Sequence, residues 1–278
     1  MIAIQELPAE QQTMVNMSRT RGQVERLLTR FDPISLAEME NCSLLDRTDT
    51  KYVMGISQLC TVLEQVRDQY RVLCINTRRL NHYQTLYFDT NDFLFYQQHH
   101  NGRGSRYKVR ERKYIGSDLT FFEVKHKTNQ NRTVKSRIQI PEVALHISGP
   151  ADDFVQVYTP FEGEELEPKL WNEYWRLTLV SKRRVERVTL DLNVEFGWDC
   201  TYSALPGLAI AEVKQAHFSQ ESDFIQQMRQ LGIRPTSFSK YCAGVYTLYD
   251  DLKVNNFKPQ IRQIKKVMQK ELTHESLH

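Results

Sequence analysis

The sequence predicts an α+β fold: a mainly antiparallel closed β-barrel that forms a tunnel, with flanking helices at both ends. Charged residues recur at every second position in three successive runs between Ser105 and Ile140, and this period places them on one face of a strand. The short spacing between the runs leaves room only for turns, so we expect an antiparallel meander. Consecutive strands with one charged face each favour closure around a polar lumen.

The first third of the chain predicts short elements in alternation. Residues 1–24 are polar and rich in Gln and Met, so we expect a flexible N-terminal segment. Apolar periodicity predicts short helices at 23–31 and 34–39, and a longer helix that Ser57 caps and that extends to about residue 69. We expect strands at 47–54, 70–75 and 83–90, followed by a short helix through Tyr96.

The rest of the chain predicts the remaining strands and then a helical C-terminus. The expected strands are at 105–114, 119–128, 132–140, 170–180, 186–196 and 208–214. The stretch 141–168 is predicted to be irregular and to contain an acidic loop. Helices are expected at 219–231 and 239–249, and a basic amphipathic helix or a solvated arm from 258. A tunnel domain would therefore occupy 25–250, and a basic C-terminal helix or tail 251–278.

Composition limits the class of protein. The 278 residues are 40% hydrophobic and 26% charged, as in an ordinary soluble domain, and the net charge is only +3, so any strong positive field must be local. The five cysteines are widely spaced without a CxxC pair, which predicts neither a zinc site nor a disulfide framework. No signal peptide or long apolar run is recognisable, so we expect a cytoplasmic protein without an integral membrane segment.

The first charged run, Lys108, Arg110 and Arg112, has two interpretations. A row of cations requires a polyanion or interleaved carboxylates to offset its self-repulsion. The row is either a wall of phosphate ligands, for which Arg forks and Lys point charges are suited, or a solvated face paired with acids.

The second run, Glu123, Lys125 and Lys127, adds a carboxylate in register with cations. A carboxylate in this position can bind a divalent metal while the cations hold phosphate, because metal and phosphate sites share oxygen donors. The alternative is an ordinary cross-strand salt bridge. Glu212 and Lys214 repeat the pattern within an apolar strand, where a buried charge must be paired or bind a ligand.

Further polar positions are less specific when taken singly. Asp191 is either the last residue of a polar row in the second hairpin or a turn residue at the end of a strand. Lys51 lies two positions after Asp49, so it either shares a charged strand face with Asp49 or is a surface lysine. Ser239 and Lys240 begin a predicted helix, whose N-terminus favours an anion, although Ser239 also suits a plain N-cap.

Several function classes find no support in the sequence. There is no P-loop, no His ligand set, and no Ser/His/Asp or Cys/His arrangement in a recognisable context. Aromatic residues do not interleave with the basic runs as stacking platforms for bases would, so no nucleic-acid partner is expected.

Nine short motifs, taken in order, resemble the VTC domain, the catalytic domain of vacuolar transporter chaperone polyphosphate polymerases in the triphosphate tunnel metalloenzyme superfamily. They are TDTKYVM at 48–54, YFDTND at 87–92, KVRERKY at 108–114, FFEVKHK at 121–127, RTVKSR at 132–137, YWRLTLVS at 174–181, ERVTLDLN at 186–193, IAEVK at 210–214 and FSKY at 238–241. The resemblance covers roughly 26–250 and suits a stand-alone bacterial-type member.

The resemblance implies a basic tunnel that holds a triphosphate and a divalent metal, Mn²⁺ or Mg²⁺. Matched motif by motif, it implies catalytic phosphate ligands at Lys51, Arg110, Arg112, Lys125, Lys135, Arg176, Arg187 and Lys240. It implies substrate contacts at Lys108, Lys127, Tyr174, Lys214 and Ser239. It implies Glu212 as the metal ligand, with Glu123 as a second candidate.

Two departures bear on the activity. The early strand reads Asp49-x-Lys51 and lacks the ExExK signature of the superfamily's hydrolases, which favours polyphosphate synthesis from ATP. An inorganic or nucleoside triphosphatase and a non-catalytic polyphosphate-binding module are the alternatives. The additional domains and membrane helices of yeast-type complexes are not recognisable, so we do not expect coupling to translocation within this chain.

The expected partners are ATP, triphosphate or polyphosphate. The basic C-terminal segment could also contact an acidic partner or a membrane surface, or be a solvated helix face. Its cations are Lys258, Arg262, Lys265, Lys266 and Lys270.

Overall fold

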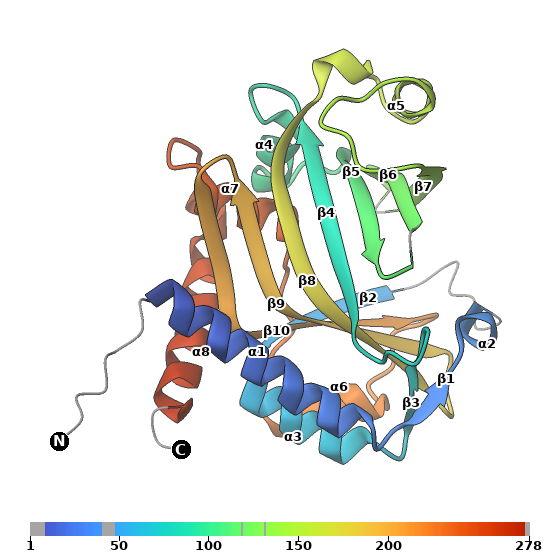
Figure 1. The fold of residues 1–278 in the computed structure, drawn as a ribbon, viewed down its shortest axis with the longest axis vertical. Helices are drawn as coiled ribbons and strands as arrows, with labels where there is room; N and C mark the ends of the chain where they lie inside the picture. Colours follow the sequence, from blue (N-terminus) through green and yellow to red (C-terminus); the bar gives the residue numbers. More distant parts are fainter. Residues whose placement is uncertain (1–8, 41–47, 118, 131, 276–278) are drawn as a thin grey trace.

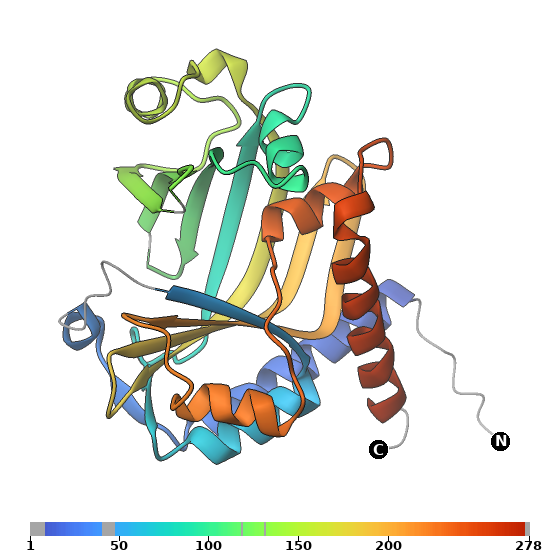
Figure 2. The same ribbon diagram turned by 180° about the vertical axis from the view of Figure 1, so that it is seen from behind.

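A single strongly curved sheet organises the molecule, with helices on both of its faces (Figures 1 and 2). The computed structural model describes residues 9–40, 48–117, 119–130 and 132–275. The strands are β1 (Asp32–Ile34), β2 (Thr48–Gly55), β3 (Tyr70–Leu73), β4 (Asn81–Asp89), β5 (Arg106–Ile115), β6 (Leu119–Lys127), β7 (Thr133–Ile140), β8 (Glu167–Ser181), β9 (Glu186–Trp198) and β10 (Thr201–Gln215). Their main order is β2-β10-β9-β8-β4-β5-β6-β7, and β3 joins β8 to β1.

The helices come mostly from the two ends of the chain. They are α1 (Ala9–Leu28), α2 (Leu36–Glu40), α3 (Ile56–Val66), α4 (Leu94–His100), α5 (Pro150–Tyr158), α6 (Asp223–Gln230), α7 (Lys240–Leu248) and α8 (Lys258–Glu275), with short 3₁₀ turns at Gly163–Glu165 and Asn255–Phe257. In the described part of the chain, none of these helices combines the length and the apolar character that a membrane span requires.

The predicted antiparallel α+β sheet with flanking helices is confirmed, but its closure into a barrel is not. β5, β6 and β7 form the expected antiparallel meander. The described hydrogen-bonded order nevertheless ends at β2 on one side and at β7 on the other. Both edge strands line one cavity, into which lysine side chains project from β2, β5 and β6. The side chains between the two edge strands, several of them positively charged, therefore fill the space in which β2 and β7 would have to pair to close a barrel.

Two segments are more ordered than the sequence suggests. Helix α1 begins at Ala9, within the segment 1–24 that the sequence predicts to be flexible, while residues 1–8 lie outside the described part. Met17 and Val24 are buried beneath this helix, and the carbonyl oxygen of Met17 accepts a hydrogen bond from Asn193 Nδ2 at 2.8 Å. Burial of these side chains against the rest of the protein therefore stabilises α1, although its sequence is too polar to predict a helix over its full length. The stretch 141–168, expected to be irregular, contains α5.

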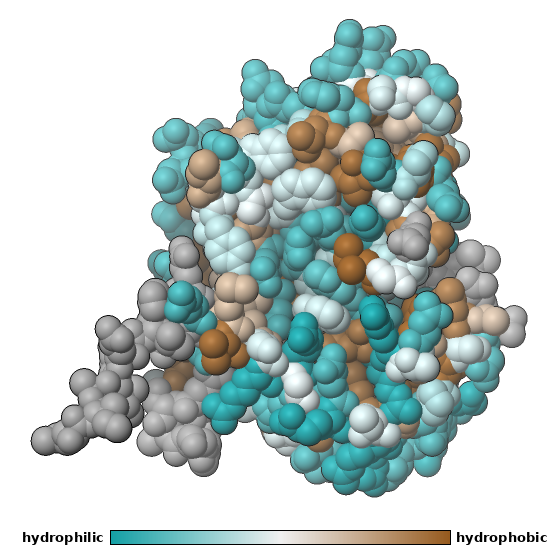
Figure 3. Space-filling view, in the orientation of Figure 1, coloured by the Kyte–Doolittle hydropathy of each residue, from teal (hydrophilic) through white to brown (hydrophobic). Residues whose placement is uncertain are grey.

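The alternation of side chains in the strands gives the sheet a charged face and an apolar face. On β8, β9 and β10 the residues that alternate with the charged ones, such as Leu177, Leu190 and Ala211, are fully buried in one core with side chains of α1, α3 and α6. The surface over α1 that faces the viewer in Figure 3 is largely hydrophilic.

Helix α7 packs on the same face of the sheet as the charges and fills one end of it with apolar side chains. A Cβ atom at Gly244 would lie 2.8 Å from side-chain atoms of both Leu170 and Phe196. Only glycine therefore lets α7 approach β8 and β9 so closely. This contact places the first turn of α7, with Ser239 and Lys240, beside the charged strands.

The outer face of β5 and β6 contains a buried acid. Val109 and Phe122 pack there, and Phe122 contacts Phe154 of α5. Glu111 is only 1% exposed, and its Oε2 accepts a hydrogen bond from the Ala144 backbone N–H at 2.7 Å. Burial raises the pKa of Glu111 from 4.5 to about 7, although the hydrogen bond from Ala144 opposes the shift.

We predict that Glu111 makes the fold less stable above neutral pH. Because its pKa is raised in the folded state, the stability associated with its protonated form is complete below pH 4.5 and is lost as the pH rises through about 7. Glu111→Gln should match the wild type near pH 5 and exceed it at pH 8, by at most about 3 kcal/mol. Urea denaturation at both pH values tests this, and an equal difference at the two would contradict it.

Candidate functional site

A cavity of about 380 Å³ lies between the two edges of the curved sheet. Its charged lining comes from β2, β5, β6 and β10, brought together by the curvature of the sheet (Figure 2). The cations are Lys51, Arg106, Lys108, Lys125 and Lys127, and the carboxylates are Asp49 and Glu212. The charged runs predicted to share one face therefore converge on one space.

A row of three lysines crosses the meander beside this cavity. Lys108 is paired in register with Lys125, and Lys125 with Lys135. Like charges directly opposite one another destabilise a sheet. Burial and neighbouring cations accordingly lower the pKa of Lys108 to about 7 and that of Lys125 to about 8, and burial lowers that of Lys135 to about 8, against the attraction of Glu123. An anion in the cavity would favour the charged forms of Lys108 and Lys125, which line it.

Glu123 anchors the cations next to this row. Its Oε2 accepts a hydrogen bond from Arg110 Nε at 2.7 Å and lies 2.6 Å from Arg110 Nη2 and 3.8 Å from Arg112 Nη1. Its Oε1 accepts a hydrogen bond from Lys135 Nζ at 2.6 Å. The side chain is 1% exposed. Burial alone would raise the pKa of Glu123, but these three cations hold it well below its ordinary value. Both carboxylate oxygens are thus already bonded to cations.

Asp191 forms a second anchor of the same kind. Arg176 donates to it in a two-pronged arrangement, Nε to Oδ1 at 2.6 Å and Nη2 to Oδ2 at 2.8 Å. Lys240, from the first turn of α7, also donates to Oδ2. Burial opposes ionisation of Asp191, but Arg176 and Lys240 keep its pKa well below the usual range. The late helix α7 is thereby tied to the middle of the sheet.

Glu212 is the most accessible of the three anchoring carboxylates. Its side chain is 21% exposed, against 1% for Glu123 and 5% for Asp191. It pairs with Lys214, and with Lys51 at 3.6 Å. Burial disfavours its charge, yet the two lysines hold its pKa well below the ordinary value. Lys214 also donates to Thr189 Oγ1 at 3.2 Å.

Tyrosine rings support the guanidinium groups, which the sequence reasoning missed. Tyr83 and Tyr174 stack with ring centroids 5.3 Å apart. The guanidinium of Arg176 lies 5.3 Å from the first ring and 5.2 Å from the second, and Lys240 Nζ lies 4.4 Å from the Tyr174 ring. Such cation–π contacts fix the cations while leaving their hydrogen-bonding groups available.

The sequence did contain a signal for this aromatic layer. Tyr83, Thr85 and Tyr87 alternate along β4, which pairs with β5. Thr85 Oγ1 accepts a hydrogen bond from Arg112 Nε at 3.3 Å, and the hydroxyl of Tyr87 accepts one from Arg110 Nη1 at 3.4 Å. The same period of two that marks the basic runs therefore also marks their supporting strand.

The remaining predicted residues are distributed around this site. Lys108 Nζ donates to Ser239 Oγ at 2.7 Å, and Ser239 also caps α7 by accepting from the Cys242 N–H. Within the described chain, the buried Tyr174 hydroxyl has no hydrogen-bond partner. Arg187 is not part of the cavity wall, and its Nη2 points to the carbonyl oxygen of Met39 at 3.5 Å.

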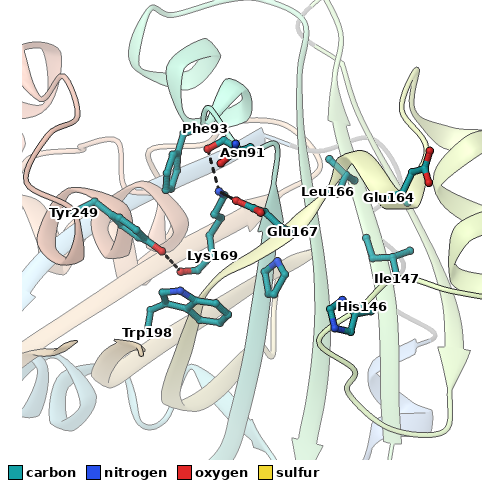
Figure 4. Close-up of a pocket in the computed structure, with 12 residues that line it drawn as sticks. Asn91, Phe93, His146, Ile147, Glu164, Leu166, Glu167, Lys169, Trp198 and Tyr249 are labelled. Atoms are coloured by element: carbon teal, nitrogen blue, oxygen red, sulfur yellow. Dashed lines mark hydrogen bonds and ion pairs between the residues drawn. The ribbon is translucent and has the colours of Figure 1, made fainter. Parts of the chain in front are cut away.

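A second cavity, of about 810 Å³, is a different kind of site (Figure 4). Lys169, which is 4% exposed, donates to the carbonyl oxygen of Asn91 at 3.1 Å, pairs with Glu167 and lies over the Phe93 ring (Figure 4). Tyr249 donates from its hydroxyl to the carbonyl oxygen of Lys169 at 2.6 Å. Because this lysine is already satisfied by its neighbours, the cavity does not extend the cationic surface described above.

The fold and the site together define a protein with a cationic cavity in a curved antiparallel sheet. The VTC domain family model matches residues 46–249, and the chain belongs to this family. No match was found among curated protein sequences.

Several solved structures are similar in fold to this chain. One is a candidate adenylyl cyclase from Hippeastrum with a dominant triphosphatase activity, at 11% identity and TM-score 0.49, covering 74% of this chain and 99% of its own. Another is a candidate adenylate cyclase from Bacillus halodurans, at 13% identity and TM-score 0.48, covering 77% and 97%. The RNA triphosphatase Pct1 of S. pombe has 9% identity and TM-score 0.29, with 95% coverage of both chains. These values are too low to support an inference about function.

The resemblance to metalloenzymes raises the question of a divalent metal. In the described part of the chain, no three His, Cys, Asp or Glu side chains come together as a metal site. Glu212 and Asp49 are the carboxylates that line the cavity beside the lysines. Mg²⁺ is commonly held by one or two carboxylates together with substrate phosphates. The site therefore fits a metal that binds together with a phosphate substrate through Glu212, and does not fit a metal held by protein groups alone.

We predict that Asp191→Ala strongly destabilises the protein and that an anion partly restores it. Removing the carboxylate leaves Arg176 and Lys240 buried without their counter-ion, at a cost of about 3–5 kcal/mol. Sulfate or triphosphate should raise the melting temperature of this variant more than that of the wild type. Glu25→Ala, which removes an exposed acid on α1, is the matched control. Equal melting temperatures for D191A and E25A would show that Asp191 is not an anchor.

We predict that metal-free triphosphate binding weakens as the pH rises, partly through Lys108. Its pKa of about 7 means that it loses its charge on going from pH 6.5 to 8.5. Lys108→Arg keeps its charge over this range. The triphosphate affinity of the wild type should therefore fall more than that of the variant, by up to about tenfold, which corresponds to about 1.4 kcal/mol for the one charge lost. Calorimetric titration at both pH values tests this, and parallel pH profiles for the two proteins would argue against it.

Proposed function

We propose that the protein is a metal-dependent phosphotransferase that synthesises inorganic polyphosphate from ATP. The observation that carries this proposal is the pair of Lys108 and Lys125 in the wall of the cavity, with Lys135 next to Lys125 in register. Like charges opposite one another destabilise a sheet, so a polyanion bound beside them would stabilise this row. Membership of the VTC domain family supports the same substrate class.

The proposed reaction requires positioning and charge neutralisation more than acid–base chemistry. The bond between the β-γ bridging oxygen and the γ-phosphorus of ATP breaks, a phosphate oxygen of the acceptor bonds to that phosphorus, and ADP leaves. The acceptor is already an oxyanion, so no strong general base is required. Arg110 and Arg176, each fixed by a buried carboxylate, would hold the transferred phosphoryl group in line.

The residues have different proposed roles. Lys51, Lys108, Lys125 and Lys127 would hold the phosphate chain along the cavity wall. Arg112, Lys135 and Lys240 would complete the charge around the anchors, with Tyr174 and Ser239 as hydroxyl contacts. We propose Glu212 as the metal ligand and Glu123 as a counter-ion to the arginines. A bound divalent ion would supply further neutralisation of charge on the phosphates.

A triphosphatase is the second candidate, because the cation network accommodates a triphosphate whether phosphate or water is the acceptor. A non-catalytic binding module would keep the cations but show no metal-dependent turnover. Incubation of purified protein with ATP and Mn²⁺ or Mg²⁺ distinguishes the three. We expect long polyphosphate and ADP. Orthophosphate alone would instead indicate a triphosphatase, and tight binding without turnover a binding module.

We predict that Glu212→Gln reduces metal-dependent turnover about 100- to 1,000-fold, as expected for loss of one transition-state charge contact. Triphosphate affinity without metal should change less than tenfold, because the lysines remain. Glu173→Gln is the matched control, since Glu173 contacts His82 and Gln84 away from the cavity. Initial rates at varied metal concentration provide the measurement. Full activity of E212Q would exclude Glu212 from the metal site.

A further inference from the structure

Helix α8 presents an exposed row of cations outside the cavity. Its five cations are Lys258, Arg262, Lys265, Lys266 and Lys270, and all five are exposed. At 100° per residue they fall on one side of the helix. In the part of the chain that the structure describes, none of them forms an ion pair. Ile264 and Glu271 are buried on the opposite side.

This row lies one segment away from the cavity. Thr236 and Ser237 line the cavity, and the Thr236 N–H donates to the carbonyl oxygen of Lys51 at 2.8 Å. On its other side, Thr236 Oγ1 donates to Gln263 Oε1 of α8 at 3.2 Å, and Gln260 donates to the carbonyl oxygen of Ser237. Figure 2 shows α8 beside the coil segment between α6 and α7. Helix α8, which carries the cations, therefore packs against the segment that forms one wall of the cavity.

The size of the cavity requires a long ligand to leave it. A volume of about 380 Å³ corresponds to about a dozen water molecules, which is room for only a short stretch of a phosphate chain. A longer chain must extend over the outer surface. Helix α8 has 18 residues and offers a track of about 27 Å.

The surroundings of α8 favour a chain in solution over a lipid surface. A helix that lies in a membrane interface inserts its apolar side between the lipids. Here Ile264 is buried against the protein, and Val267 and Met268 are partly buried in the same core. Leu272 alone is a large apolar side chain exposed on the described part of α8. The helix thus offers charge without an apolar face to insert.

We propose that the exposed cationic face of α8 binds the polyphosphate chain where it extends beyond the cavity. This inference rests on the proposed function, since it takes the substrate class from it. It adds a second binding surface, which would engage long chains and leave triphosphate unaffected.

The test compares two triple variants that remove the same charge. One is Lys265→Gln, Lys266→Gln and Lys270→Gln on α8. The control is Arg19→Gln, Arg26→Gln and Arg30→Gln, three exposed cations at α1 on the far side of the sheet. Affinities are measured at two salt concentrations for triphosphate and for polyphosphate of about 100 units, a length that far exceeds the cavity. Thermal unfolding verifies that both variants are folded.

We expect the α8 variant to lose at least tenfold in affinity for the long chain, with a shallower salt dependence, because fewer counter-ions are released. Its triphosphate affinity should equal that of the wild type, and the α1 variant should be unchanged for both ligands. If both variants lost the same affinity for the long chain, the loss would be an effect of net charge alone and the proposal would be wrong. It would also be wrong if the α8 variant kept the long-chain affinity of the wild type.

Two further binding measurements, with anionic lipid vesicles and with single-stranded DNA, test other ligands for the cationic face of α8. If the α8 variant loses binding only to vesicles with anionic lipids, or only to single-stranded DNA, while polyphosphate binding persists, the proposal is wrong. Failure of the proposed function gives a different result, since wild-type protein would then form no polyphosphate from ATP, whatever the effect of the α8 variant on long-chain binding.

Discussion

The burial of like charges on one face of the sheet is the constraint on which the rest of this structure depends. Cations from several strands and one helix converge, and burial penalises each of them. Three carboxylates, Glu123, Asp191 and Glu212, offset this cost by each binding two or three cations. Lys108 and Lys125 are less completely compensated than Lys135, which pairs with Glu123, and burial lowers the pKa of all three. A site built in this way is poised for an anion.

The architecture follows from holding these charges in place. Curvature of the sheet brings β2 and β10 opposite β5 and β6, which are distant along the chain. Helix α7 then closes one end of the charged face, which the close approach at Gly244 permits, and adds Lys240 to Asp191. Beneath the guanidiniums, the stacked rings of Tyr83 and Tyr174 fix their positions. Rigid anchoring leaves the cations oriented before any ligand arrives, which is the basis of electrostatic preorganisation.

Each of the three carboxylates lies in a row of polar residues along one strand, but the three differ in how exposed their side chains are. Glu123 and Asp191 are buried and fully occupied by cations, so they suit the role of structural counter-ions. Glu212 keeps part of its side chain open at the cavity. A partly exposed carboxylate among lysines is suited to a metal that arrives with its phosphate ligand. The division between holding cations and holding metal is therefore set by exposure rather than by residue type.

The sequence by itself determined the antiparallel α+β sheet, its meander and the face that carries the charges, because side-chain direction in a strand depends only on local alternation. Period two along β5, β6 and β10 placed Arg110, Glu123 and Glu212 correctly on one face. Only the tertiary structure decided which cation pairs with which carboxylate, since Lys240 and Asp191 are 49 positions apart. It also decided that the sheet stays open between β2 and β7, that α1 is helical from Ala9, and that Tyr83 supports Arg176. These features depend on curvature and burial, which arise from contacts between distant segments and leave no periodic signal in the chain.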